Sequence, residues 1–228
     1  MTPEEACGWI ESHGVVPVVR TRSAEDARRA VDALRAGGIT VFEITLTVPN
    51  ALELIRTLAR EYKSQLLVGV GTVLSREDAE RSVEAGAEFV VCPGFDPAIV
   101  QCVRALGRAI MPGALTPTEV LGAWNAGAHV VKVFPCSAMG GAPYLQALRG
   151  PFPHIKLMPT GGVDATTAGD YIRAGACALG VGGKLVDQAA LDAGRDELLS
   201  ERAEALLGAV AAARGAQATP ANRPRSEA

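Results

Sequence analysis

The chain has 228 residues, of which 48% are hydrophobic, and a formal net charge of −3 with acidic and basic residues interspersed. This is enough apolar material for one sizeable core, and the lack of a basic stripe argues against nucleic acid as a partner. The first residues do not form a basic region followed by an apolar one, and no run approaches 18 apolar residues, so we expect a cytoplasmic protein with no membrane partner.

The predicted elements begin with a short helix over residues 4–12 and a first buried strand over residues 14–20. Ser23 is a good N-cap for the helix that follows, which runs to Arg35. Each later strand is also followed by a segment that can be helical. These strands are expected at residues 40–46, 66–70, 89–93, 109–112, 130–135, 155–159 and 179–182.

A small-residue hinge recurs before four of the strands. Its glycine falls where a helix ends and could supply the left-handed residue there. The four copies are AGGI (36–39), AGAE (85–88), AGAH (126–129) and AGAC (174–177).

Eight alternating units in about 200 residues are typical of a (β/α)8 TIM barrel, an α/β fold. We therefore predict one domain over residues 1–213, with a short N-terminal helix and a closing helix over residues 196–213. The tail, residues 214–228, loses apolar residues and gains two prolines, and it is expected to be disordered.

Cysteines and histidines are scattered along the chain. There are five cysteines and three histidines, and none of them forms a short-spaced pair of the kind that binds zinc. The sequence therefore predicts neither a disulfide framework nor a metal site.

A lysine, Lys132, lies in the middle of the apolar strand predicted at residues 130–135. Burial generally disfavours the charged form of a lysine, and the free amine is the nucleophile that condenses with a ketone to form a Schiff base. A structural ion pair, or a side chain that reaches the barrel rim, would explain the same residue without catalysis.

Glu43 is a second ionisable residue within a strand. Since Phe42 and Ile44 flank it, side-chain alternation would turn Glu43 into the barrel, where it could meet Lys132. The two could neutralise each other as an ion pair, or the carboxylate could move protons while the amine attacks a carbonyl. The sequence pattern alone favours neither reading.

Two glycine pairs follow the last two strands, Gly161-Gly162 and Gly182-Gly183. Barrels often bind phosphate with the loops at this point, through backbone N–H groups that glycine leaves accessible. Tight turns without a ligand are the alternative.

Six short strings carry a family resemblance. They are FEITL (42–46), VGVGTVL (68–74), PGF (93–95), MPG (111–113), KVFP (132–135) and MPTGGV (158–163). In this order and at this spacing, over residues 15–186, the chain resembles the 2-dehydro-3-deoxy-phosphogluconate (KDPG) / 4-hydroxy-2-oxoglutarate (KHG) aldolases.

The resemblance implies a class I aldolase, a carbon–carbon lyase that needs no metal or other cofactor. It would split a 2-keto-3-deoxy-6-phospho sugar acid into pyruvate and glyceraldehyde 3-phosphate, and KHG into pyruvate and glyoxylate. Family members are typically trimers, so a homotrimer is expected.

The resemblance also assigns roles to matching residues. Lys132 would form the Schiff base and Glu43 would be the general acid/base. The residues expected to contact substrate are Thr72, which would hold the pyruvate carboxylate, Pro93, Phe134, Thr160, Gly161, Gly162, and Gly182 and Gly183, which would bind phosphate.

Two positions depart from the family pattern. Thr47, which is also expected to contact substrate, stands where well-studied members have a carboxylate-binding arginine, and we expect Arg20, at the end of the first strand, to supply that charge instead. Lys184 stands where a serine commonly follows the glycine pair, and it could add a point charge to the phosphate site or face solvent. Both departures bear on the choice of sugar acid.

Three other interpretations remain open. The enzyme could prefer the galactonate epimer of the substrate, or the chain could be a sugar-phosphate sensor that binds without turnover. A barrel isomerase using carboxylates or Cys92 and Cys136 is a weaker alternative, because buried cysteine is most often an apolar filler.

Overall fold

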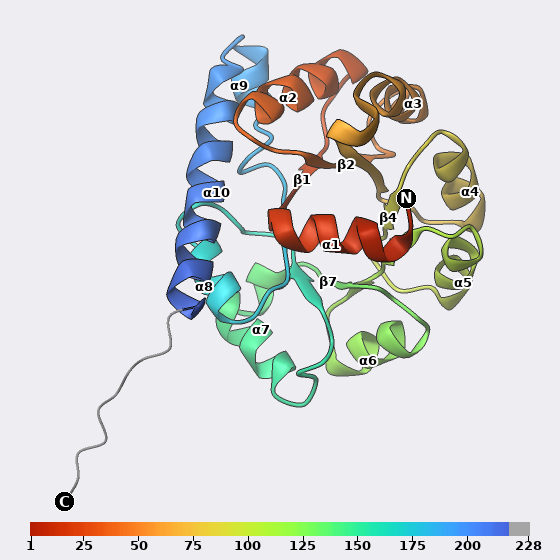
Figure 1. Ribbon diagram of the computed structural model, residues 1–228, viewed down its shortest axis with the longest axis vertical. Coiled ribbons are helices and arrows are strands. Elements are labelled where there is room, and N and C mark those ends of the chain that lie inside the picture. Colours follow the sequence, from red (N-terminus) through yellow and green to blue (C-terminus); the bar gives the residue numbers. More distant parts are fainter. Residues whose placement is uncertain (219–228) are drawn as a thin grey trace, which may run out of the picture.

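The computed structural model describes residues 1–218 and shows a barrel of parallel strands surrounded by helices (Figure 1). The strands are β1 Val15–Val19, β2 Val41–Thr45, β3 Leu67–Gly71, β4 Phe89–Val91, β5 Ala109–Met111, β6 Gly113–Ala114, β7 Val131–Val133, β8 Leu157–Pro159 and β9 Leu179–Val181. The α-helices are α1 Pro3–His13, α2 Ala24–Ala36, α3 Ala51–Tyr62, α4 Arg76–Glu84, α5 Pro97–Ala105, α6 Pro117–Asn125, α7 Ala142–Arg149, α8 Ala168–Arg173, α9 Gln188–Asp192 and α10 Glu197–Ala218. Two 3-10 helices, η1 Lys63–Gln65 and η2 Cys136–Met139, lie between them.

The strands close into the predicted (β/α)8 barrel. Hydrogen bonds join them in the orders β5-β4-β3-β2-β1-β9 and β6-β7-β8, and a bridge between Thr160 and Gly180 links the two sheets. Pro112, which has no N–H to donate, separates β5 from β6. These two short segments together occupy the place of one strand of the barrel. All the pairs are parallel, so the carboxyl ends of the strands meet at the same mouth.

The predicted hinge glycines have the backbone geometry that their pattern indicated. Gly38, Gly86, Gly127 and Gly175 all have φ between 94° and 108°, a conformation that residues with a side chain rarely adopt. Each ends a helix and turns the chain into the next strand. The repeat in the sequence is therefore the repeat of αβ connections around the barrel.

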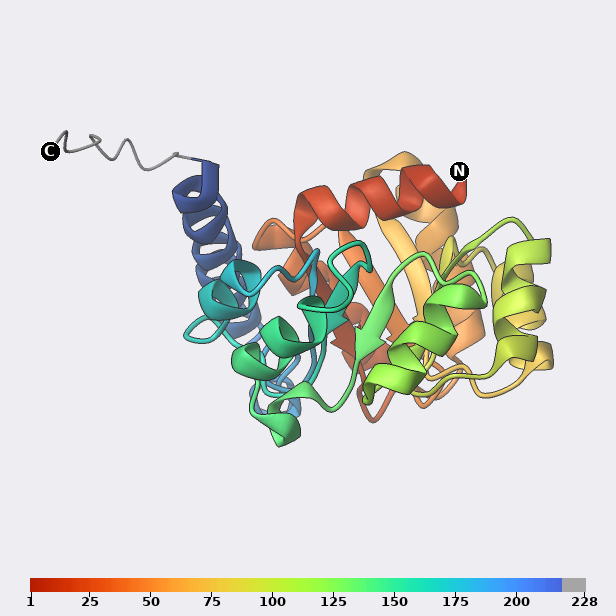
Figure 2. The same ribbon diagram turned by 90° about the horizontal axis from the view of Figure 1, so that it is seen from below.

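Helix α1 covers the end of the barrel at which the strands start (Figures 1 and 2). Its Ala6, Cys7 and Ile10 are buried in one cluster with the first inward-facing residues of the strands, such as Val16 and Phe89. The larger part of the core lies between the strands and the outer helices. Because α1 covers one mouth, substrate access is expected at the opposite mouth.

The closing helix is longer than predicted, and the expected disordered tail is wrong for residues 214–218. These residues continue α10, and the remainder of that tail lies outside the described residues. Arg214 donates hydrogen bonds to the carbonyls of Glu11 and Ser12 at 2.6 and 2.7 Å, so it caps the last turn of α1. The composition of the tail gives no sign of this contact, because the carbonyls that Arg214 binds lie at the other end of the chain.

His13, beside this contact, should make the fold sensitive to acid. Burial, with a smaller contribution from the Arg214 charge, lowers the pKa of His13 from 6.5 to about 4. The unfolded chain then binds a proton at higher pH than the folded chain does. The stabilisation is fully present above pH 6.5 and is lost as the pH falls toward 4, by up to about 3 kcal/mol.

The variant His13→Gln keeps an acceptor near the Thr40 N–H but does not titrate. We expect its melting temperature to fall less than that of the wild type between pH 7 and pH 4, as measured by circular dichroism. Parallel curves for the two proteins would show that His13 is not the source of the acid sensitivity.

No helix within residues 1–218 is both long and apolar enough to cross a membrane.

Candidate active site

A cavity of about 300 Å³ opens at the carboxyl ends of the strands. Most of the residues predicted to contact substrate line it, together with Lys132. The lining consists of Val18, Arg20, Thr72, Pro93, Lys132, Phe134, Thr160, Gly161, Gly162, Val163, Gly182, Gly183 and Lys184. The structure thus brings together side chains and turns from six different strands.

Lys132 and Glu43 meet in the barrel interior, as side-chain alternation predicted. Lys132 is 5% exposed and Glu43 is completely buried, and Lys132 Nζ lies 3.5 Å from Glu43 Oε1. Within residues 1–218, neither carboxylate oxygen of Glu43 receives a hydrogen bond. A buried carboxylate with such free acceptor capacity is costly, so its position beside the lysine indicates a functional site.

Glycine on the neighbouring strand makes room for this carboxylate. Glu43 is paired in register with Gly69, and Gly71 lies two residues further along β3. A Cβ atom at Gly71 would lie 2.0 Å from Glu43 Oε1, which is far inside van der Waals contact. The absence of a side chain at Gly71 therefore leaves the space that the Glu43 carboxylate occupies.

Arg20 and Thr72 form a second polar pair in the cavity. The Arg20 guanidinium donates from Nη2 to Thr72 Oγ1 at 3.2 Å. Thr72 has φ 60°, in the left-handed region where residues other than glycine are uncommon. Strained backbone of this kind is concentrated at functional sites, and here it presents the threonine hydroxyl to the arginine.

Thr160 is a further polar group held in the wall of the cavity. It is 5% exposed, and within the described chain its Oγ1 has no hydrogen-bond partner. Gly180 leaves space for this hydroxyl, because a Cβ there would lie 2.2 Å from Thr160 Oγ1.

The two glycine turns differ in their geometry. Gly161 and Gly162 have φ of 95° and 72°, so this turn requires glycine for its backbone conformation. Gly182 and Gly183 have open space where a side chain would be, which leaves their backbone accessible. Lys184, next to them, is exposed.

Phe134 closes the cavity on the side of β7. Its side chain is 37% exposed, and the Lys132 ammonium position lies 5.5 Å from the centroid of its ring. The ring therefore lies beside the lysine in the wall of the cavity.

Thr47 is not brought to this cavity. It is exposed, and its hydroxyl lies 2.8 Å from Thr45 Oγ1, so the side chain is turned along its own loop. Contact with substrate remains a prediction for Thr47. Val18 and Val163 line the cavity but were not predicted; strand alternation from Arg20 could have identified Val18.

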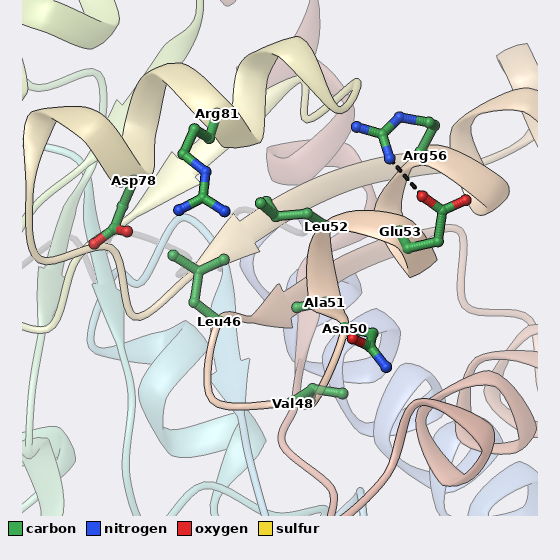
Figure 3. Close-up of a pocket in the computed structure, with 9 residues that line it drawn as sticks. All are labelled: Leu46, Val48, Asn50, Ala51, Leu52, Glu53, Arg56, Asp78 and Arg81. Carbon is green, nitrogen blue, oxygen red and sulfur yellow. Dashed lines mark hydrogen bonds and ion pairs between the residues drawn. The ribbon is translucent and has the colours of Figure 1, made fainter.

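A larger cavity of about 560 Å³ lies outside this site, between the start of α3 and helix α4 (Figure 3). Arg81 and Asp78 of α4 face Leu46 across it, and Glu53 forms an ion pair with Arg56 at 2.5 Å. Its acidic and basic groups are at the surface, where water solvates them. The smaller cavity is the better candidate because it contains the buried lysine and lies above a buried carboxylate.

The cysteines near the strand ends are poor nucleophiles. Burial raises the pKa of Cys92 to about 12 and that of Cys136 to about 11, so both thiols are protonated near neutral pH. Within residues 1–218, no three histidine, cysteine or acidic side chains are grouped so that they could hold a metal ion. The lysine and the carboxylate are the groups best placed for covalent and acid–base chemistry.

Known proteins with this sequence pattern are aldolases. The sequence model of a family described as KDPG and KHG aldolase matches residues 9–200. The KHG/KDPG aldolase of Escherichia coli (strain K12) is 36% identical over 197 residues, which cover 86% of this chain and 92% of that protein. The 2-dehydro-3-deoxy-phosphogluconate aldolase of Treponema pallidum (strain Nichols) is 37% identical over 163 residues, or 72% of this chain and 77% of that protein.

A solved structure has the same fold. It is the KDPG aldolase of Legionella pneumophila, with pyruvate captured at low pH as a covalent carbinolamine intermediate. That protein is 30% identical to this chain, with a TM-score of 0.81 over 88% of this chain and 97% of the other.

Proposed function

The chain belongs to the KDPG and KHG aldolase family, and we propose that it acts as a metal-independent class I aldolase in which Lys132 forms the Schiff base. It is a lyase that cleaves 2-dehydro-3-deoxy-6-phosphogluconate, with the galactonate epimer as a minor alternative substrate. One observation carries the proposed mechanism: an almost fully buried lysine amine lies 3.5 Å from a buried carboxylate in the accessible mouth of the barrel.

In the proposed reaction the amine of Lys132 attacks the C2 ketone of the substrate, and loss of water from the carbinolamine gives an iminium ion. Removal of the proton from the C4 hydroxyl lets the C3–C4 bond break. The aldehyde leaves and its bonding electrons remain on the pyruvyl fragment as an enamine. Protonation at C3 and hydrolysis then release pyruvate and restore the amine.

Glu43 is proposed to move the protons in these steps. Its carboxylate oxygens have no hydrogen-bond partner in residues 1–218, so they are free to accept a proton and return it. A group within 3.5 Å of the reacting nitrogen is close enough to serve carbinolamine dehydration. The same carboxylate would stabilise the positive charge of the iminium ion.

The two ends of the substrate would be held by different parts of the cavity. We assign the carboxylate to Arg20 and Thr72, and the phosphate to the exposed turn of Gly182 and Gly183, with Lys184 beside it. Thr160 and the turn after β8 would contact the keto-acid portion. The predicted homotrimer and cytoplasmic location rest on the family resemblance and on composition.

The test is reduction of the purified protein with borohydride in the presence of pyruvate, followed by peptide mass spectrometry. We expect a covalent adduct on Lys132, unchanged when a metal chelator is present. A folded protein that binds sugar phosphates without forming an adduct would overturn the aldolase mechanism and favour the sensor.

Arg20→Ala should weaken substrate binding more than catalysis. The change removes a charge-assisted hydrogen-bond donor from the cavity, so KM for both phosphorylated and unphosphorylated 2-keto acids should rise about 10- to 100-fold. Arg56→Ala, in the cavity of Figure 3, is the matched control and should leave KM unchanged. An unaltered KM in Arg20→Ala would refute the role of Arg20.

A further inference from the structure

Helix α9 lies between the glycine turn after β9 and the connection between β1 and α2. It begins five residues after Gly183, and the Gly182 carbonyl accepts the N–H groups of Leu185 and Val186 at 2.8 and 3.0 Å. The segment that leads into α9 is therefore fixed to the glycine turn that we assign to the phosphate. On its other side α9 contacts the connection between β1 and α2, which carries Arg20.

Gln188, the first residue of α9, makes three hydrogen bonds to this connection and its surroundings. Its Oε1 accepts the backbone N–H of Arg22 at 3.0 Å. Its Nε2 donates to Asp26 Oδ2 at 3.0 Å and to Asp192 Oδ1 at 2.9 Å. The partners determine the orientation of the amide, because a backbone N–H can only donate and a carboxylate only accepts.

The segment held in this way is short and otherwise well fixed. Arg22 also pairs with Asp192 through its side chain at 2.9 Å. Thr21 donates to the Ser23 carbonyl at 2.8 Å, and Ser23 caps α2. Arg20 lies two residues before the N–H that Gln188 holds, and its guanidinium reaches Thr72.

We infer that Gln188 is a positioning residue for the aldol reaction, which holds the Arg20 connection so that the guanidinium faces Thr72 and the substrate carboxylate. This inference rests on the carboxylate role proposed for Arg20. Because the segment before α9 is bonded to Gly182, the same side chain also links the proposed phosphate turn to the connection that carries Arg20. Gln188 acts through Arg20 and does not line the cavity.

Only an amide side chain at position 188 can make all three hydrogen bonds, because it must accept from the Arg22 N–H and donate to two carboxylates. Alanine would leave the Arg22 N–H without its partner and would remove one donor each from Asp26 and Asp192, which keep their contacts with Arg29 and Arg22. Glutamate could still accept the Arg22 N–H, but it would place a third carboxylate beside Asp26 and Asp192, and like charges this close repel. Gln188→Glu should therefore disturb the connection more than Gln188→Ala does.

The test is a double-mutant cycle on Gln188→Ala, Arg20→Ala and the double variant, with 2-dehydro-3-deoxy-6-phosphogluconate as substrate. In the wild-type background Gln188→Ala should raise KM roughly five- to tenfold, with kcat changed less than about twofold. In the Arg20→Ala background the same change should have no further effect. Gln188→Glu should raise KM further.

Asp196→Asn provides the matched control. Asp196 binds Arg29 of α2 at 2.5 and 2.9 Å, so its loss weakens a neighbouring contact to α2 without touching residues 20–23. It should lower the melting temperature and leave KM unchanged. If Asp196→Asn raises KM as much as Gln188→Ala does, the effect is one of general stability and the inference fails.

Equal effects of Gln188→Ala in both backgrounds would also overturn the inference, because Gln188 would then not act through Arg20. If Arg20→Ala itself leaves KM unchanged, both the carboxylate-binding role of Arg20 and the positioning role of Gln188 are refuted. The borohydride adduct on Lys132 at saturating pyruvate reports separately on the Schiff base, so failure here is distinguishable from failure of the aldolase mechanism.

Discussion

Lys132→Met is expected to abolish the pyruvate adduct and to lower kcat by at least about 10⁴-fold. The thioether fills a similar volume but cannot form an imine, so the electron sink for carbon–carbon cleavage is lost. Steady-state kinetics on 2-dehydro-3-deoxy-6-phosphogluconate and borohydride trapping with pyruvate measure the two effects.

The Lys132→Met variant leaves Glu43 buried without its cation, which by itself can destabilise the fold. Lys132→Arg keeps the charge and cannot form the imine, so it should fold like the wild type and remain inactive. Lys156→Met is the control lysine: Lys156 pairs with Glu11 of α1 at the closed end of the barrel, and its loss should preserve activity.

The position of the pyruvate adduct in these variants also tests whether Lys184 can act as the nucleophile. Lys184 also lines the cavity and is exposed. If Lys132→Arg still traps pyruvate and the added mass lies on Lys184, then Lys184 can serve as the nucleophile and the assignment to Lys132 is wrong.

The barrel could be predicted from the sequence because its signals are local. Strands buried on both faces are continuous apolar runs, and the hinge glycines mark each return to the sheet. Local pattern also placed Lys132 and Glu43 correctly, since alternation within a strand fixes which way a side chain points. The strand ends were less accurate: the strand predicted at residues 130–135 is Val131–Val133 in the structure.

Residues outside the strands could not be placed in this way. Thr47 lies in the connection after β2, where no period fixes the side-chain direction, and it does not line the cavity. Gln188 was not singled out from the sequence, because its hydrogen-bond partners Arg22 and Asp26 lie more than 160 positions away. Arg214 was assigned to a disordered tail for the same reason.

The space available around a side chain is the other property that the sequence does not show. Gly71 belongs to a string that marks the family, but only the structure shows that its missing side chain accommodates the Glu43 carboxylate. The position of a buried carboxylate can thus depend on an atom that is absent from its neighbour. This gives Gly71 a testable role apart from backbone flexibility.

Gly71→Ala should therefore impair catalysis as severely as loss of the carboxylate function. The new methyl group would lie 2.0 Å from Glu43 Oε1 and 2.6 Å from Glu43 Cδ, so the carboxylate must leave its present position beside Lys132. We expect kcat to fall about 10²- to 10³-fold, within the range for loss of a general acid/base. The kcat of Glu43→Gln should fall by a similar factor. The kcat of the double variant should be no lower than that of the more damaging single variant.

Gly8→Ala is the matched glycine control, because a Cβ at Gly8 on α1 has no neighbour within 4 Å, and it should keep wild-type kcat. Trapping of pyruvate adds a second readout. Gly71→Ala should still form the adduct on Lys132, although slowly, because the amine remains while proton transfer is impaired. If Gly71→Ala turned over at the wild-type rate, the carboxylate would have to tolerate displacement, and Glu43 would not be the group that moves protons in this barrel.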